Sequence, residues 1–153
     1  MDCEDVEPCG CRPLNLVDVC VLGLVVMATW TLVIKYVAPL TWAYAENQAG
    51  HSVAAPIMWD FWWVAHIWLA RMFWNRHRWA WMSGLLVTVA EIVIVVVKFV
   101  GFFRAPDPEF WRLLWFTNKV YVLAYFLVLL VLLFLPAFQR QLRPLDQRLR
   151  LDP

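Results

Sequence analysis

Apolar stretches long enough to cross a lipid bilayer occur at four places in this chain. They cover residues 16–39, 57–75, 79–103 and 113–135, and each is close to the roughly 20 residues that a transmembrane helix needs. A helix satisfies its own backbone polar groups, as lipid requires. Hydrophobic residues make up 63% of the chain, against about 45 to 50% in soluble domains. The sequence therefore predicts an all-α integral membrane protein.

Four spans would place both ends of the chain on one side of the membrane, and we expect a single domain folded as an up-down bundle. Basic residues indicate which side this is, because Lys and Arg gather in cytoplasmic loops. The loops away from the termini hold only Arg104 and Arg112. Both termini are therefore expected to face the cytoplasm, or the matrix in a mitochondrial membrane. The arginines on the terminal side are Arg12, Arg76, Arg78, Arg140, Arg143, Arg148 and Arg150.

The second and third apolar runs are joined by the short polar turn at residues 75–78 and should form an antiparallel hairpin. With a helical rise of about 1.5 Å per residue, residues at equal depth then have numbers that sum to roughly 157. Asp60 and Lys98 meet this condition, and so do His66 and Glu91, near the bilayer centre where an unpaired charge is most costly. Asp60 and His66 are about 120° apart around a helix, so we expect at most one pair to be in direct contact.

Further polar residues share faces of these helices. Glu91 and Lys98 lie on one face of the third run with Gly84 and Thr88, and this polar stripe should face protein rather than lipid. The second run also carries Arg71, so it should insert only behind neighbouring helices. The fourth run has a small polar face available to a neighbouring helix, made of Asn118, Tyr121 and Tyr125.

Other charged residues of the apolar runs lie towards the interfaces. Asp18 and Lys35 stand near the two ends of the first run, and Lys119 is one or two turns inside the fourth. Long basic side chains can extend along the helix to reach water, so we assign these charges no function. Pro39 is expected to end the first helix, leaving residues 40–56 as a loop outside the membrane.

The two tails differ in chemistry. Residues 1–13 are acidic and contain Cys3, Cys9 and Cys11, whose spacing lacks the C-x2-C element of common zinc sites. No metal site is predicted there. Cytoplasmic thiols should be reduced, with acylation of a juxtamembrane cysteine as the alternative, and an inverted topology would favour a disulfide. Residues 139–153 combine leucines at helical spacing with arginines, which predicts a short amphipathic helix on the membrane surface or on a partner. Its basic residues, suited to anionic headgroups, are Arg140, Arg143, Arg148 and Arg150.

No cofactor is predicted, although the second run has an aromatic face that includes His66. Haem or pigment packing at His66 is one interpretation of this face, and packing against neighbouring helices is the one we favour. The sequence lacks G-x-S-x-G, Walker, H-E-x-x-H and C-x-x-C-H motifs, so it does not indicate an enzyme. Nucleic-acid binding is not indicated either, because no basic stripe with exposed aromatic residues lies outside the spans.

These features favour a non-catalytic accessory, structural or assembly subunit of a larger membrane complex, with buried charges that pin helices together. The expected partners are the bilayer and other membrane subunits or further copies of the chain. One alternative is a small oligomeric ion or proton channel or transporter that uses Glu91 and His66. Another is a lipid- or sterol-binding membrane enzyme, whose sign would be a cavity between the second, third and fourth helices that reaches both residues.

Overall fold

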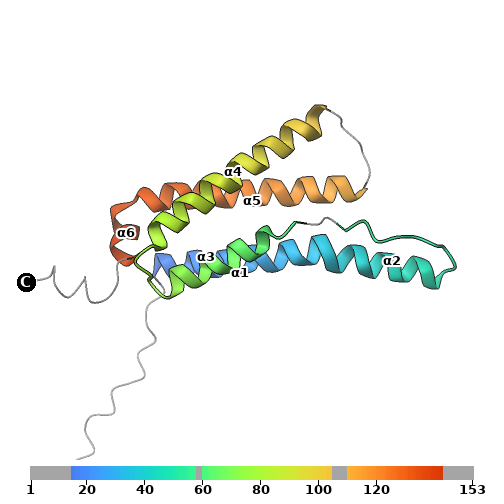
Figure 1. The fold of residues 1–153 in the computed structure, drawn as a ribbon, viewed down its shortest axis with the longest axis horizontal. Coiled ribbons are helices and arrows are strands. Elements are labelled where there is room, and N and C mark those ends of the chain that lie inside the picture. The colour runs from blue at the N-terminus through green and yellow to red at the C-terminus, as the bar shows by residue number, and fades with distance from the viewer. Residues whose placement is uncertain (1–14, 58–59, 105–109, 143–153) are drawn as a thin grey trace, which may run out of the picture.

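The computed structural model describes residues 15–57, 60–104 and 110–142, and every regular element within them is helical. The predicted all-α class is confirmed for this part of the chain. The first three elements follow one another without a break, and the second of them is a π-helical segment (Figure 1). The elements are α1 (Leu16–Leu32), η1 (Val33–Val37), α2 (Ala38–Gln48), α3 (Trp62–Trp74), α4 (Ala80–Arg104), α5 (Phe110–Phe134) and α6 (Pro136–Leu142).

Within the described residues, three helical segments are long and apolar enough to cross a membrane, namely Leu16–Gln48, Ala80–Arg104 and Phe110–Phe134. The last two agree with the predicted spans to within three residues. The second predicted span differs, because α3 begins at Trp62 rather than near residue 57. Its 13 residues rise about 20 Å, less than the roughly 30 Å of hydrocarbon in a bilayer. Residues 51–57, 60 and 61 are not helical.

Pro39 does not end the first helix, contrary to the prediction. A proline ring inside a helix clashes with the carbonyl four residues earlier. The π-helical segment Val33–Val37 directly precedes this position, and its wider turn relieves such crowding. The helix therefore continues to Gln48 and stops before Gly50, whose φ of 89° suits a helix terminus. Residues 40–48 belong to this helix and not to a loop.

The helices pack as two neighbouring pairs, α1 with α3 and α4 with α5. An apolar core joins the pairs near α6. Gly84 lets α4 lie close to Phe73 of α3, since a Cβ at position 84 would be 2.8 Å from Phe73 Cζ. The fully buried members of this core include Leu24, Leu69, Phe73, Phe126, Leu129, Leu133 and Phe138.

Polar contacts join the two described ends of the chain. Asn15 and Asp18 cap the start of α1 reciprocally. Arg76 donates hydrogen bonds to Asn15 Oδ1 at 3.0 Å and to Asp18 Oδ1 at 2.9 Å. The Val17 backbone N–H donates to Gln141 Oε1 at 3.3 Å, so α1 begins beside α6. We call this the terminal end of the bundle, and the end where α2 and α4 stop the loop end.

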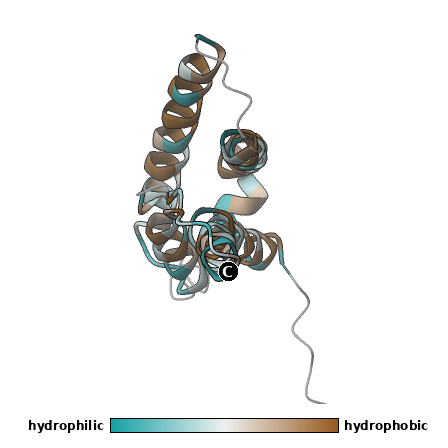
Figure 2. Ribbon diagram, turned by 90° about the vertical axis from the view of Figure 1, so that its right-hand side faces the viewer, coloured by the Kyte–Doolittle hydropathy of each residue, from teal (hydrophilic) through white to brown (hydrophobic). Residues whose placement is uncertain are grey.

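Towards the loop end, α4 diverges from α5 (Figure 1). Figure 2 shows α4 reaching away from the other helices with an apolar surface along most of its length. At the terminal end, α6 covers only the start of the predicted amphipathic tail, and its Arg140 is exposed. The other tail residues of interest lie outside the described residues: Cys3, Cys9, Cys11, Arg143, Arg148 and Arg150.

Candidate functional site

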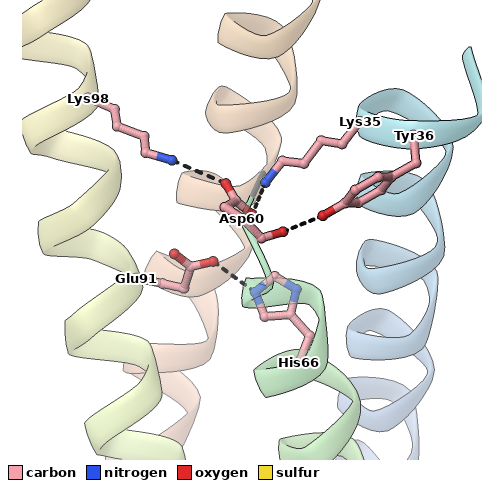
Figure 3. A network of polar contacts seen from close by, with 6 residues as sticks. All are labelled: Lys35, Tyr36, Asp60, His66, Glu91 and Lys98. Atoms are coloured by element: carbon pink, nitrogen blue, oxygen red, sulfur yellow. Dashed lines mark hydrogen bonds and ion pairs between the residues drawn. The ribbon is translucent and has the colours of Figure 1, made fainter. Parts of the chain in front are cut away.

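Asp60 lies just before α3 and connects three parts of the chain (Figure 3). Its carboxylate accepts hydrogen bonds from Lys35 Nζ of η1 and, at 3.2 Å, from Lys98 Nζ of α4. The Tyr36 hydroxyl donates to the backbone carbonyl of Asp60 at 2.6 Å. That carbonyl belongs to non-helical backbone and needs a donor from elsewhere. These contacts fix the entry to α3 against both the first helix and α4.

A second pair lies further towards the terminal end. His66 Nε2 of α3 and Glu91 Oε1 of α4 are 2.9 Å apart, and each side chain is 1% exposed. The imidazole also packs against the ring of Phe126, with centroids 5.2 Å apart. The outer atoms of the pair, His66 Nδ1 and Glu91 Oε2, have no hydrogen-bond partner in the part of the chain that the structure describes. The pair therefore joins α3 to α4 and leaves one polar atom of each residue unmet.

Both hairpin pairs are in direct contact, so the expectation that at most one would form is wrong. The expectation assumed that Asp60 and His66 lie on one helix about 120° apart. Asp60 instead precedes α3, in backbone whose direction is not tied to the helical period. Its carboxylate can therefore turn towards Lys98 while His66 contacts Glu91. The matching of depths by residue number remains valid because Asp60 is only two residues from the helix start.

Two lysines that were expected to reach water are buried instead. Lys35 is 1% exposed and contacts Asp60, and Lys119 is 5% exposed. Among the described residues Lys119 forms no ion pair or hydrogen bond, although the charge of Glu91 acts on it at longer range. The position of Lys35 near the end of the first apolar run gave no sign of this burial.

Three of the four residues of the polar stripe on α4 face protein as predicted. Gly84, Thr88 and Glu91 are buried, whereas Lys98 is 35% exposed. Thr88 Oγ1 has no hydrogen-bond partner among the described residues. Asn118 of α5 is also buried with both amide atoms unmet. The interior of the bundle thus holds several polar atoms that the described residues leave without a hydrogen bond.

The remaining predicted residues lie apart from this cluster. Asn118, Tyr121 and Tyr125 do not act as one polar face, because Asn118 is buried and Tyr121 is exposed. Tyr125 turns inward and donates a hydrogen bond to the Cys20 carbonyl at 2.8 Å. Arg71 is exposed on α3. The cluster proper consists of Lys35, Tyr36, Asp60, His66, Glu91 and Lys98.

A haem or pigment does not fit at His66. The ring nitrogen Nε2 contacts Glu91, and the other ring nitrogen, Nδ1, is buried. The His66 side chain as a whole is 1% exposed. An iron ligand needs an open position on the ring nitrogen, with space for the macrocycle beside it. In the described part of the chain, no group of three or more His, Cys, Asp or Glu side chains could hold a metal ion.

A cavity of about 500 Å³ lies beside the cluster, between α4 and α5. It is placed towards the loop end, where these helices diverge (Figure 1). Three basic residues line it, Lys98, Arg112 and Lys119, together with aromatic side chains. Neither His66 nor Glu91 is among its lining residues.

Known proteins do not provide a template for this arrangement. Comparison of the chain with models of protein families, with curated protein sequences and with solved structures finds no significant match. The function is therefore argued from the positions, contacts and burial of the residues themselves.

Proposed function

We propose that the protein is a non-catalytic accessory, structural or assembly subunit of a larger membrane complex, which packs against other subunits within the bilayer. Tyr121 carries this proposal. Its side chain is 57% exposed on α5, and among the described residues its hydroxyl forms no hydrogen bond. A polar group that faces lipid without a partner is unfavourable.

The depth of Tyr121 makes this exposure significant. Tyr121 is one residue from the midpoint of α5 (Phe110–Phe134). It lies about 16 Å along the helix from Phe110, close to the centre of roughly 30 Å of hydrocarbon. At that depth the hydroxyl is far from either interface. A hydrogen bond across a helix–helix interface is the usual way to satisfy such a group.

The buried charges are consistent with a structural role. Asp60 contacts two lysines from other parts of the chain, and His66 contacts Glu91. These contacts occupy Asp60, Lys35 and Lys98, together with one polar atom each of His66 and Glu91. They also hold together segments that are far apart in the sequence, as expected for charges that pin helices.

In this proposal the chain crosses the bilayer four times as an up-down bundle. The second crossing is made by α3 together with the non-helical segment that precedes it, which Asp60 holds at membrane depth. Of the 18-residue apolar window of α4, 22% is buried, compared with 39% for the window in Leu16–Gln48. The surface of α4 is therefore the most available to lipid or to other subunits. Both termini face the cytoplasm or the matrix.

Replacing Tyr121 by Phe tests the proposal. The change removes one hydroxyl and keeps the ring, so a membrane partner should dissociate more readily while the fold stays intact. Hydrogen bonds between membrane helices contribute about 0.6 to 2 kcal/mol, which corresponds to a roughly 3- to 30-fold weaker association. The amount of partner retained during purification in mild detergent, measured by quantitative mass spectrometry, gives the change.

Two matched variants separate assembly from folding. Tyr44→Phe removes a hydroxyl that is also exposed but lies in α2, and it should leave partner retention unchanged. Tyr125→Phe removes the internal bond to the Cys20 carbonyl, so it should lower stability rather than retention. The proposal fails if Tyr121→Phe retains every co-purifying protein as the unaltered chain does.

A channel or transporter that uses Glu91 and His66 is the second candidate. The observation in its favour is the set of unmet polar atoms in the interior, which includes Glu91 Oε2 and His66 Nδ1. Against it, fully buried apolar side chains such as Phe73 and Leu133 fill the bundle at the terminal end. Proton or cation flux into liposomes that is unaffected by Glu91→Gln would remove this candidate.

The enzyme alternative receives less support from the geometry. A lipid- or sterol-modifying enzyme would need its substrate to reach both Glu91 and His66. The cavity between α4 and α5 is not lined by either residue. We therefore do not propose an enzymatic reaction.

A further inference from the structure

We propose that the cavity between α4 and α5 binds the anionic oxygen group of an amphipathic ligand, with phosphate as the chemical class and a membrane phospholipid as its source. This inference does not depend on the accessory role. The cavity is about 500 Å³ in volume, within the roughly 300 to 1,000 Å³ that is usual for ligand pockets.

The basic residues of the cavity are aligned along one face of α5. Arg112 and Lys119 are seven residues apart and both line the cavity, which places them on the same side of the helix about 10 Å apart in depth. Lys98 lines the cavity from α4. An anion between the two helices would therefore meet basic groups from both walls.

Lys119 is the strongest argument for a ligand. Lys119 is only 5% exposed. Among the described residues it nevertheless forms no ion pair or hydrogen bond. A buried ammonium without a counterion is unfavourable. Neither nearby acid of the described residues contacts Lys119 directly, because Asp60 is shared by Lys35 and Lys98, and Glu91 is in contact with His66.

The charges of this region do not balance. Among the described residues of this region, the basic side chains Lys35, Lys98 and Lys119 outnumber the acidic side chains Asp60 and Glu91. An anion held at Lys119 would neutralise the excess inside a low-dielectric region, where it matters most.

The other walls suit the apolar part of a lipid. Phe99, Phe102 and Phe116 line the cavity, and the rings of Phe102 and Phe116 are stacked with centroids 4.4 Å apart. Trp115 lines it too. Gly101 on the α4 side of the cavity leaves open space for a ligand, because a Cβ at this position would meet no atom within 4 Å. Basic pockets between membrane helices commonly bind anionic headgroups, and this cavity places aromatic surface next to the charges.

The test uses the full chain in lipid nanodiscs made either of phosphatidylcholine alone or with added phosphatidylglycerol of the same acyl chains. Lipid retained by the protein after transfer to detergent is counted by native mass spectrometry. We expect selective retention of phosphatidylglycerol. Lys119→Gln should lower it about fivefold, the effect of one basic side chain on an anionic lipid, and Arg112→Gln should also lower it.

Two further variants distinguish a built site from general attraction to a charged surface. Arg104→Gln removes a basic side chain at the same end of α4 that does not line the cavity, and it should change nothing. Gly101→Leu fills the cavity and keeps all the charges, so it should abolish retention. Because Gly101 and Arg112 are at exposed positions, these variants remain informative if Lys119→Gln does not fold.

Inorganic phosphate distinguishes the two sources of the anion. Phosphate alone could raise the unfolding temperature of the unaltered protein but not of Lys119→Gln, with no lipid retained. That result would support the anion-binding site and identify a soluble phosphate, rather than a lipid, as its ligand. The proposal is overturned if neither lipid nor phosphate responds to Lys119→Gln and Arg112→Gln. It is also overturned if Gly101→Leu retains phosphatidylglycerol as well as the unaltered chain does.

Discussion

Replacing Asp60 by Asn should strongly destabilise the fold, because it leaves Lys35 buried without its carboxylate partner. Lys35 is 1% exposed and Asp60 14% exposed. Removing one member of a buried ion pair costs about 3 to 5 kcal/mol. The second partner, Lys98, is 35% exposed, so its charge is less deeply buried than that of Lys35. We therefore expect the free energy of unfolding to fall by about 3 to 5 kcal/mol, mainly through Lys35.

Reversible unfolding in mixed micelles with increasing dodecyl sulfate, followed by tryptophan fluorescence, measures this loss. Lys35→Met should cost less than Asp60→Asn, because the partly exposed carboxylate keeps its contact with Lys98. Lys98→Met should also cost less than Asp60→Asn, because Asp60 keeps its contact with the buried Lys35. The double variant Lys35→Met with Asp60→Asn should recover much of the loss, since no unpaired charge remains buried.

The order of these effects tests whether burial determines how strongly each contact of the cluster stabilises the fold. If Asp60→Asn stays within about 0.5 kcal/mol of the unaltered protein, the range usual for surface substitutions, the cluster does not hold the fold together. If Lys98→Met costs more than Lys35→Met, burial does not determine the strength of these contacts. Either result would refute the account of the cluster given above.

Two further predictions concern the packing of the bundle and can be measured by the same titration. Gly84→Ala should lower the free energy of unfolding by about 1 to 3 kcal/mol, because its Cβ would lie 2.8 Å from Phe73 Cζ. At Gly101 a Cβ has open space, so Gly101→Ala should be neutral or slightly stabilising. Equal effects of the two substitutions would contradict the close contact at Gly84. Asp18→Ala should cost about 1 to 2 kcal/mol, since it removes part of the helix cap and the contact with Arg76. An Asp18→Ala variant as stable as the unaltered protein would show that this end of α1 is not held by these contacts.

The sequence predicted the helical class and matched the depths of the two residue pairs of the hairpin, although it predicted that at most one pair would be in direct contact. Apolar periodicity and helical rise are sufficient for these, because both depend only on local geometry. The bounds of α4 and α5 also follow from their apolar runs, to within three residues.

The structure differs from the sequence-based prediction at points that depend on local backbone geometry or on tertiary packing, neither of which the apolar pattern contains. The π-helical segment Val33–Val37 lets the helix pass Pro39, and a pattern based on a single helical period does not predict it. The late start of α3 frees Asp60 from the helix and brings it to Lys35. The burial of Lys119 depends on where α4 and α5 diverge, which is a property of tertiary packing. The lysines therefore looked like interface residues in the sequence and are interior residues in the fold.

The most direct test of the proposed accessory role is the mass of the native particle after extraction in mild detergent. For an accessory subunit, we expect at least one other membrane protein to remain bound in fixed stoichiometry, and Tyr121→Phe to reduce its amount while Tyr44→Phe does not. A monodisperse monomer whose mass is that of this chain with bound detergent and lipid would contradict it.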